Sequence, residues 1–173
     1  RLLWQYEFPH QGKNQNMPTP VADRGRILLG AENRGLHSLE PRQKNGEWTV
    51  EKRWSQPKVA LNMSTAVSNG NLLYGFSHYG KGRLFCVNAT TGEILWQGPG
   101  RSGENATFLS LPYHVVALTD SGELQIITAS AEKLEVVASW RVADSPTWTP
   151  PVLLPNGILV KDHKTLTRWS FAK

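Results

Sequence analysis

Residues 82–96 read Gly-Arg-Leu-Phe-Cys-Val-Asn-Ala-Thr-Thr-Gly-Glu-Ile-Leu-Trp, and this stretch decides the fold. It consists of an alternating run, a tight turn over Asn88–Gly92 and a second run that ends at Trp96. Alternating residues on both sides of Asn, Thr and Gly are typical of an antiparallel β-hairpin. The pattern returns in weaker form along the chain, which indicates an array of one repeated unit.

A six-residue anchor marks the repeat. Asn62-Met63-Ser64-Thr65-Ala66-Val67 has counterparts that begin at residues 16, 105 and 147, so the anchors are 46, 43 and 42 residues apart. A propeller blade of four short strands needs about 40–50 residues. Helix-pair solenoids have similar repeat lengths, so the local pattern has to decide between the two.

The local pattern favours strands. Two short apolar runs follow each anchor, and turn formers such as Ser68-Asn69-Gly70 and Asp120-Ser121-Gly122 link them. Further strands end at Trp54, Trp96 and Trp140, and no stretch has a sustained helical period. We therefore predict an all-β propeller of about four blades, each a four-stranded antiparallel sheet, over residues 16–54, 62–97, 105–141 and 147–171.

The two ends of the chain suggest how the array closes. Residues 1–8 resemble the 93–97 strand, whereas the last repeat has no counterpart of an outer strand. We expect residues 1–8 to be the outer strand of the last blade, because an unpaired strand edge would otherwise be exposed. We also expect the chain to be a fragment of a longer propeller. Three arrangements stay open: a closed four-blade ring, an open half-ring, and a homodimer that completes a propeller, which we favour.

Composition narrows the class of protein. The chain has 173 residues, of which 39% are hydrophobic, and it lacks a run long enough for membrane insertion. Its only cysteine, Cys86, excludes an internal disulfide and a thiolate metal cage. The net charge is +5, but the basic residues are scattered among turns, so we expect no nucleic-acid partner.

The motif at 84–96 resembles the pyrroloquinoline-quinone-type (PQQ-type) propeller repeat: an apolar strand, Asn-Ala-x-Thr-Gly, Glu, two apolar residues and Trp. The resemblance implies that the Trp docks between neighbouring blades and that the Gly permits the turn. The family includes quinone-dependent alcohol dehydrogenases and non-enzymatic propellers, among them an outer-membrane protein assembly scaffold. The resemblance also implies an extracytoplasmic location for this chain, periplasmic or secreted.

The dehydrogenases of this family carry an adjacent Cys pair, a Trp stacked on the quinone, and acidic and Asn ligands for calcium. This chain has one Cys, and none of Asp120, Asp144 and Asp162 has the spacing of a calcium loop. The resemblance therefore implies the propeller fold, and we expect no bound cofactor. PQQ and calcium belong only to the alternative that the chain is part of a quinone-dependent oxidoreductase.

The residues before each innermost strand are the first candidate site, because these segments converge on one mouth of a propeller channel. Asn16, Asn62 and Asn105 would place a ring of amides there, with Met63 and Trp148 beside them. The alternative is that each Asn caps a local turn through the backbone.

The loop around His78 is the second candidate. A hydrolase would also need a nucleophile and an acid, for which Ser64, Ser77 and Glu104 are conceivable, but no Gly-x-Ser-x-Gly elbow is present. A surface histidine is the alternative. Glu104 and Asp144 enter the same mouth and would make it locally acidic.

These observations predict a non-catalytic binding or scaffold propeller that holds a protein, peptide or glycan at the channel mouth. The quinone-dependent oxidoreductase is the first alternative. A sugar-binding or sugar-active propeller that uses Trp148 as a stacking platform is the second.

Overall fold

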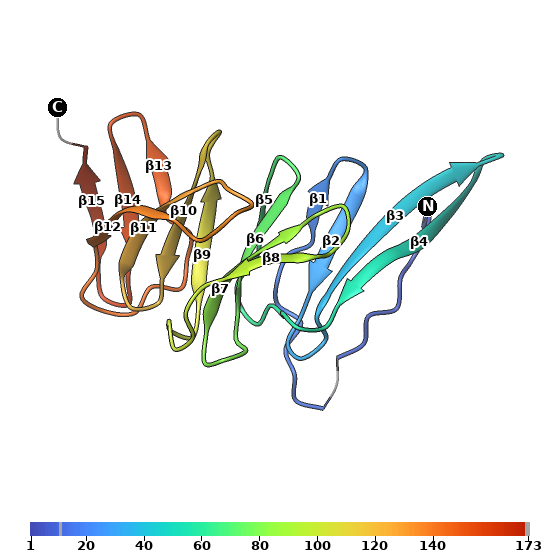
Figure 1. Ribbon diagram of the computed structural model, residues 1–173, viewed down its shortest axis with the longest axis horizontal. Coiled ribbons are helices and arrows are strands. Elements are labelled where there is room, and N and C mark those ends of the chain that lie inside the picture. The colour runs from blue at the N-terminus through green and yellow to red at the C-terminus, as the bar shows by residue number, and fades with distance from the viewer. Residues whose placement is uncertain (11, 172–173) are drawn as a thin grey trace.

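The computed structural model describes residues 1–10 and 12–171, which form fifteen strands joined by turns and loops (Figure 1). The strands are β1 (Val21–Asp23), β2 (Arg26–Gly30), β3 (Leu36–Lys44), β4 (Glu47–Gln56), β5 (Val67–Asn69), β6 (Leu72–Ser77), β7 (Arg83–Asn88), β8 (Ile94–Gln97), β9 (Ala106–Ser110), β10 (His114–Thr119), β11 (Glu123–Thr128), β12 (Val136–Arg141), β13 (Val152–Leu154), β14 (Gly157–Lys161) and β15 (Leu166–Ser170). Within these ranges, no helix is long and apolar enough to cross a membrane.

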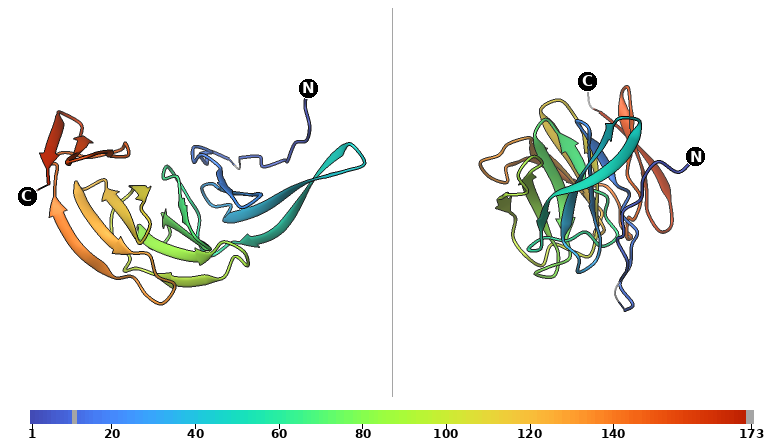
Figure 2. Two further views of the ribbon diagram at one scale, coloured as in Figure 1. Left: turned by 90° about the horizontal axis from the view of Figure 1, so that it is seen from above. Right: turned by 90° about the vertical axis from the view of Figure 1, so that its right-hand side faces the viewer.

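The strands form four separate antiparallel sheets, each built from strands that are consecutive in the chain. Sheets β1–β4, β5–β8 and β9–β12 have four strands, and the described residues give the last sheet three, β13–β15. The sheets stand side by side along an open arc (Figure 2). The predicted all-β propeller architecture is confirmed, and we number its blades 1 to 4 in this order.

A row of directly paired residues crosses each blade at the same place. In blade 2 the row runs Val67, Tyr74, Cys86 and Trp96. In blade 1 the same row ends at Trp54, opposite Ser38. The two tryptophans are therefore equivalent, as the repeats predict.

Trp140 is not equivalent to them, so its predicted place in the repeat is wrong. The equivalent row of blade 3 runs Leu109, Val116, Ile126 and Ala138, whereas Trp140 lies opposite Leu124. The reason is that the Trp comes later in its strand: Trp140 is the fifth residue of β12, whereas Trp96 is the third residue of β8. The position of the repeat therefore falls on Ala138, two residues before Trp140.

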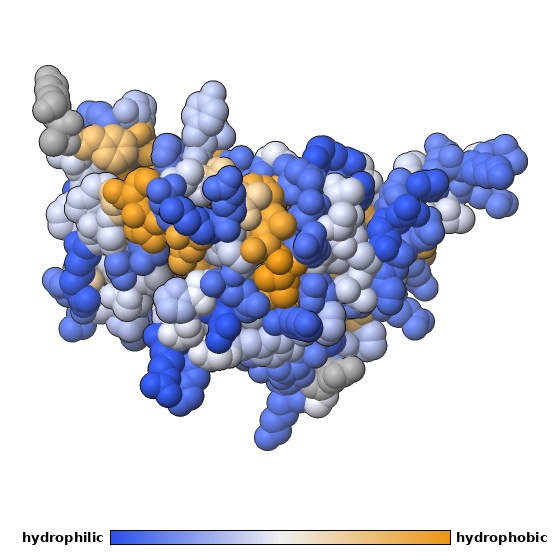
Figure 3. All heavy atoms as spheres, in the orientation of Figure 1, coloured by the Kyte–Doolittle hydropathy of each residue, from blue (hydrophilic) through white to orange (hydrophobic). Residues whose placement is uncertain are grey.

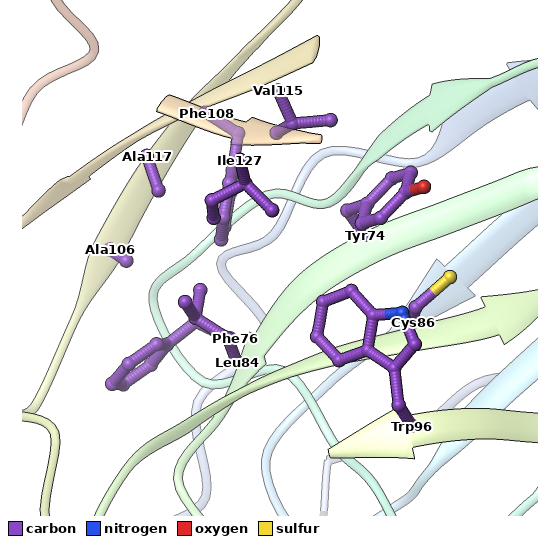
Figure 4. Close-up of a cluster of buried hydrophobic side chains, with 10 residues drawn as sticks. All are labelled: Tyr74, Phe76, Leu84, Cys86, Trp96, Ala106, Phe108, Val115, Ala117 and Ile127. Carbon is purple, nitrogen blue, oxygen red and sulfur yellow. The ribbon is translucent and has the colours of Figure 1, made fainter. Parts of the chain in front are cut away.

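The core lies between the blades. Tyr74, Phe76 and Trp96 of blade 2 pack against Phe108 and Ile127 of blade 3 (Figure 4). Cys86 is buried in the same cluster, and this burial raises the pKa of its thiol to about 12. The thiol is therefore protonated at neutral pH and packs as a small apolar side chain.

Residues 1–8 differ from the prediction that they complete the last sheet. They form no strand and lie at the blade 1 end of the arc, where the Tyr6 hydroxyl is 2.8 Å from His37 Nδ1. The Arg34 guanidinium covers the Phe8 ring at 4.3 Å and donates to Phe8 O at 2.9 Å. These contacts hold the segment to blade 1, whereas blade 4 is at the other end of the arc (Figure 2). A single chain thus forms an open arc, and the closed four-blade ring is wrong.

Candidate functional site

One end of the blades carries the segments that precede the inner strands and the loops between the second and third strands. We call this end the mouth; it is the lower edge in Figure 1. Between blades 2 and 3 the mouth has a hollow of about 380 Å³. The hollow is lined by Asn62, Met63, His78, Lys81, Gly82, Gly103 and Glu104. Four predicted site residues, Asn62, Met63, His78 and Glu104, are therefore brought together.

The loop that holds His78 differs in chemistry from the corresponding loops of the other blades. Blades 1 and 3 have the acids Glu32 and Asp120 at the position of His78, and the loop of blade 4 has Asp162 one residue before that position. Each acid accepts hydrogen bonds from backbone amides of its own blade or of the segment leading into it. Glu32 Oε2 accepts from Gln15 N at 3.0 Å, and both carboxylate oxygens of Asp120 accept from Glu104 N at 3.2 Å.

Asp162 uses its carboxylate to close the loop of blade 4. Its Oδ1 accepts from the amides of Lys164 and Thr165 at 2.7 and 2.5 Å. The Thr165 amide is the main cause that lowers the pKa of Asp162 to about 2, and the Lys164 amide adds to it against the opposing effect of desolvation. The acids of blades 3 and 4 are thus bound to backbone.

His78 leaves one ring nitrogen without a partner. Its Nε2 lies 3.0 Å from Asn33 Oδ1, and because an amide oxygen only accepts, Nε2 is the donor. In the neutral ring Nδ1 is then an acceptor, and it is buried with no partner among the described residues. Asn62 Oδ1, another lining acceptor, is buried and unpartnered in the same way. Two acceptors of the hollow therefore lack the donors that buried polar atoms normally have.

Glycines and charges shape the rest of the hollow. Gly82 has φ +89°, and a Cβ there would meet Gly103 O at 1.9 Å, so the two loops approach in a way that only glycine permits. The Ser102 amide donates to Gly82 O at 3.0 Å and fixes this approach. Lys81 and Glu104 add one charge of each sign to the lining. Their arrangement suits a polar ligand of low net charge.

The predicted ring of asparagines is not brought together. Asn105 is buried, and its Oδ1 accepts from Ser64 Oγ at 2.5 Å. Asn16 Oδ1 accepts from Arg34 at 2.7 Å, and its Nδ2 donates to Phe8 O at 3.3 Å. Both side chains are bonded to other segments of the chain, so neither is the local turn cap that was the alternative interpretation. Asn62 differs from them because its oxygen is unpartnered.

Asp144 and Trp148 also lie apart from the hollow. Asp144 is fully exposed, with Oδ1 3.5 Å from Arg141 Nε. Trp148 is an exposed side chain in the segment that leads into blade 4. Neither residue lines the hollow, so the predicted pairing of Asp144 with Glu104 at one acidic rim is not seen.

The serines beside His78 are occupied by backbone contacts. Ser77 Oγ accepts from the amides of Ala60 and Tyr79 at 3.1 and 3.3 Å. Ser64 Oγ accepts from Ala106 N at 3.2 Å while it donates to Asn105. Both serines therefore hold loops in place, and neither is poised as a nucleophile for His78.

The described residues do not fit a quinone–calcium centre. They contain no cluster of three His, Cys, Asp or Glu side chains that could hold a metal ion. Asp120 and Asp162, the mouth acids of blades 3 and 4, direct oxygens to backbone amides. Cys86 is buried between blades, away from the mouth.

Lys81, Gly82 and Gly103 also line the hollow. The sequence placed Lys81 and Gly103 in the candidate loops of His78 and Glu104, but it singled out none of the three as a site residue. The signal for them was present, since His78 stands in a loop with three glycines nearby. Glycines that allow two loops to touch often mark a shaped surface.

Comparisons with known proteins agree with the propeller. The family model described as outer membrane protein assembly factor BamB matches residues 1–168. No curated protein matches the chain. Among solved structures, the computationally designed Ika4 protein is similar with a TM-score of 0.67 and 12% identity, over 99% of both chains.

Two natural propellers are also similar. BamB from Moraxella catarrhalis has a TM-score of 0.51 and 14% identity over 98% of this chain, and the WD40 β-propeller domain of Doa1 has 0.65 and 17% over 92%. The chain spans 63% of that BamB chain and 53% of the Doa1 chain. At these identities the likeness shows the fold alone.

Proposed function

The chain belongs to the family described as outer membrane protein assembly factor BamB, and from this membership we propose that it is a non-catalytic propeller module that binds a protein or peptide segment at the mouth. The binding site is the hollow between blades 2 and 3. The observation that carries the proposal is the pair of buried, unpartnered acceptors, Asn62 Oδ1 and His78 Nδ1.

Hydrogen-bond chemistry favours a peptide. Two acceptors require two donors, and an extended backbone or a side-chain amide offers N–H groups at short intervals. Met63 gives the hollow an adaptable apolar wall, which suits a segment of varied sequence. Lys81 and Glu104 can each meet an opposite charge on the segment.

The other properties of the module follow from the same residues. A binding module needs no quinone or calcium, in agreement with acids that are bound to backbone amides. The description of the family model as an outer membrane protein assembly factor supports an extracytoplasmic location, periplasmic or secreted.

The test uses a peptide selected from a random display library on the 173-residue chain, with affinity measured by fluorescence anisotropy. His78→Ala and Asn62→Ala should each weaken binding about fivefold, the equivalent of one net hydrogen bond of about 1 kcal/mol. His163→Ala, an exposed histidine of the blade 4 loop, is the matched control and should bind like the parent. Equal affinity of all three variants would refute the site, and selection of a glycan instead of a peptide would refute the ligand class.

A further inference from the structure

The outer edge of blade 4 is open. In blades 1 to 3 the third strand pairs with a fourth, whereas β15 has a partner only on its β14 side among the described residues. Beside it, an apolar groove of about 590 Å³ runs between blades 3 and 4. Trp140, Leu153, Ile158, Trp169 and Phe171 are among its lining residues. Apolar side chains are exposed at this end of the molecule (Figure 3).

The hydrogen bonds of β15 show which backbone groups face the open side. At one end the Asp162 amide donates to Thr165 O at 3.0 Å, and at the other the Phe171 amide donates to Asn156 O at 3.1 Å. Hydrogen-bonded and non-hydrogen-bonded residue pairs alternate along an antiparallel ladder. Arg168 and Leu159 of β14 therefore form a non-hydrogen-bonded pair. Arg168 therefore directs its N–H and C=O away from β14, where a fourth strand would bind.

Arg168 also marks the place that this strand should fill. It continues the row Val152, Leu159, Arg168, which corresponds to Val67, Tyr74, Cys86 in blade 2. Trp96 occupies the next position in blade 2. The vacant position is thus one that a Trp-bearing outer strand occupies in blades 1 and 2.

The chain carries one further segment of this kind. Leu2-Leu3-Trp4-Gln5 matches Ile94-Leu95-Trp96-Gln97 of β8. It precedes blade 1 in the chain just as each outer strand precedes the next blade. Leu2 and Leu3 are 73% and 50% exposed, and the segment has no strand partner. Its apolar side chains are therefore free to pair elsewhere.

We propose that residues 1–8 of a second copy of this chain form the fourth strand of blade 4. Residues 1–8 of the same copy do not supply it, because Tyr6 and Phe8 hold them to blade 1 at the opposite end of the arc (Figure 2). Two copies would exchange these strands about a two-fold axis, so that each blade 4 meets the blade 1 of its partner and the two arcs close one ring.

The packing of β8 gives the orientation of the incoming side chains. Ile94 packs in the core between blades 1 and 2, whereas Leu95 and Trp96 pack in the core between blades 2 and 3. By correspondence, Leu2 enters the groove beside β15, and Leu3 and Trp4 face blade 1 of the copy that donates them. The strand thus covers the groove and joins the two copies.

The experiment is sedimentation equilibrium of the 173-residue chain. A particle of twice 19.3 kDa is expected for the parent. Leu2→Asp combined with Leu3→Asp should raise the dissociation constant at least 100-fold, because two charges would enter an apolar seam. These side chains are exposed in the single chain, so its fold should persist, as circular dichroism can verify. Tyr113→Asp, an 80% exposed aromatic that does not line the groove, is the control and should leave the mass unchanged.

A second variant tests the accepting edge. Arg168→Pro removes the outward N–H without taking a bond from the β14 ladder, and it should also give a single-copy particle. When this variant is mixed with the Leu2→Asp, Leu3→Asp variant, one intact junction forms and a two-copy particle should return. A parent that stays at 19.3 kDa, a Leu2 and Leu3 variant that keeps the parent mass, or a Tyr113→Asp control that dissociates would each overturn the proposal.

Discussion

Trp96 of strand β8 extends from blade 2 toward blade 3, and the Trp96 indole N–H donates to Ser130 O at 3.0 Å. This side chain is 8% exposed and packs with Tyr74 at a centroid distance of 5.8 Å. Between blades 3 and 4, Trp140 of β12 is 53% exposed and borders the open groove. Both gaps contain a buried apolar cluster, but the first is filled out to its Trp, whereas the second leaves a groove beside Trp140.

The difference shows what makes a blade complete. Trp54 and Trp96 each reach a turn of the following blade, through indole N–H bonds to Ala89 O and Ser130 O. Both depend on an outer strand in the register of the repeat, with the Trp at the end of the paired row. Blade 3 has Ala138 at this position, and blade 4 shows no outer strand among its described residues. We therefore expect the Trp-filled gaps to determine the stability of the fold, and the unpaired edge of blade 4 to determine the assembly of two copies.

The largest effect should come from removing Trp96. Trp96→Ala deletes a buried ring and a hydrogen bond and should lower the free energy of unfolding by about 3–5 kcal/mol. Trp140→Ala, the counterpart at the open gap, should cost less than about 1 kcal/mol because half of its surface is already in water. Urea unfolding of both variants measures the pair. Similar losses would show that the two gaps are packed alike.

A smaller effect is expected at Gly92, whose turn receives Trp54 of blade 1. Gly92 has φ +77°, and a Cβ would lie 2.6 Å from the Trp54 ring, so Gly92→Ala should cost about 2–3 kcal/mol. Gly46→Ala is the matched control, since Gly46 has φ +83° with nothing near its Cβ position. It should cost only the strain of about 1 kcal/mol. Thermal unfolding compares the two, and equal losses would mean that the Trp54 contact adds nothing.

The smallest effect is expected at the mouth loop of blade 4, where the Lys164 and Thr165 amides donate to the Asp162 carboxylate. The folded state lowers the pKa of Asp162 from 3.8 to about 2, so its carboxylate stabilises the loop fully above the ordinary pKa. This contribution is lost as the pH falls from 3.8 through about 2. A carboxyl carbon NMR titration should give a midpoint near 2, and Asp162→Asn should remove that transition. A midpoint near 3.8 would contradict the hydrogen bonds of the loop.

The propeller was predictable because its signal is repeated. Anchors recur at near-constant spacing in every blade, and turns such as Asn69-Gly70 and Asn156-Gly157 support them, so one irregular copy does not hide the pattern. The place of Trp140 was not predictable, because it depends on how many residues the turn after Thr128 takes up before β12 begins. The place of residues 1–8 was not predictable either. It is set by Arg34 and His37, which are distant in sequence and belong to no motif.

The candidate site was predictable in part. Loops at one end of antiparallel blades must share that end, and this geometry brought Asn62, His78 and Glu104 to one hollow. Whether each Asn side chain is free at the mouth depends on hydrogen bonds from other segments, such as Ser64 to Asn105 and Arg34 to Asn16. Such pairings need the coordinates, because no local pattern encodes them.

Residue-resolved hydrogen exchange tests the comparison of the two gaps most directly. Cys86 and Arg168 hold the same place in their rows, but only Cys86 is paired with an outer strand. In dilute solution, the Cys86 amide should exchange slowly and the Arg168 amide fast; at high protein concentration, Arg168 should become protected while Cys86 stays unchanged. Equal protection of the two amides in dilute solution, or an Arg168 amide indifferent to concentration, would contradict the account.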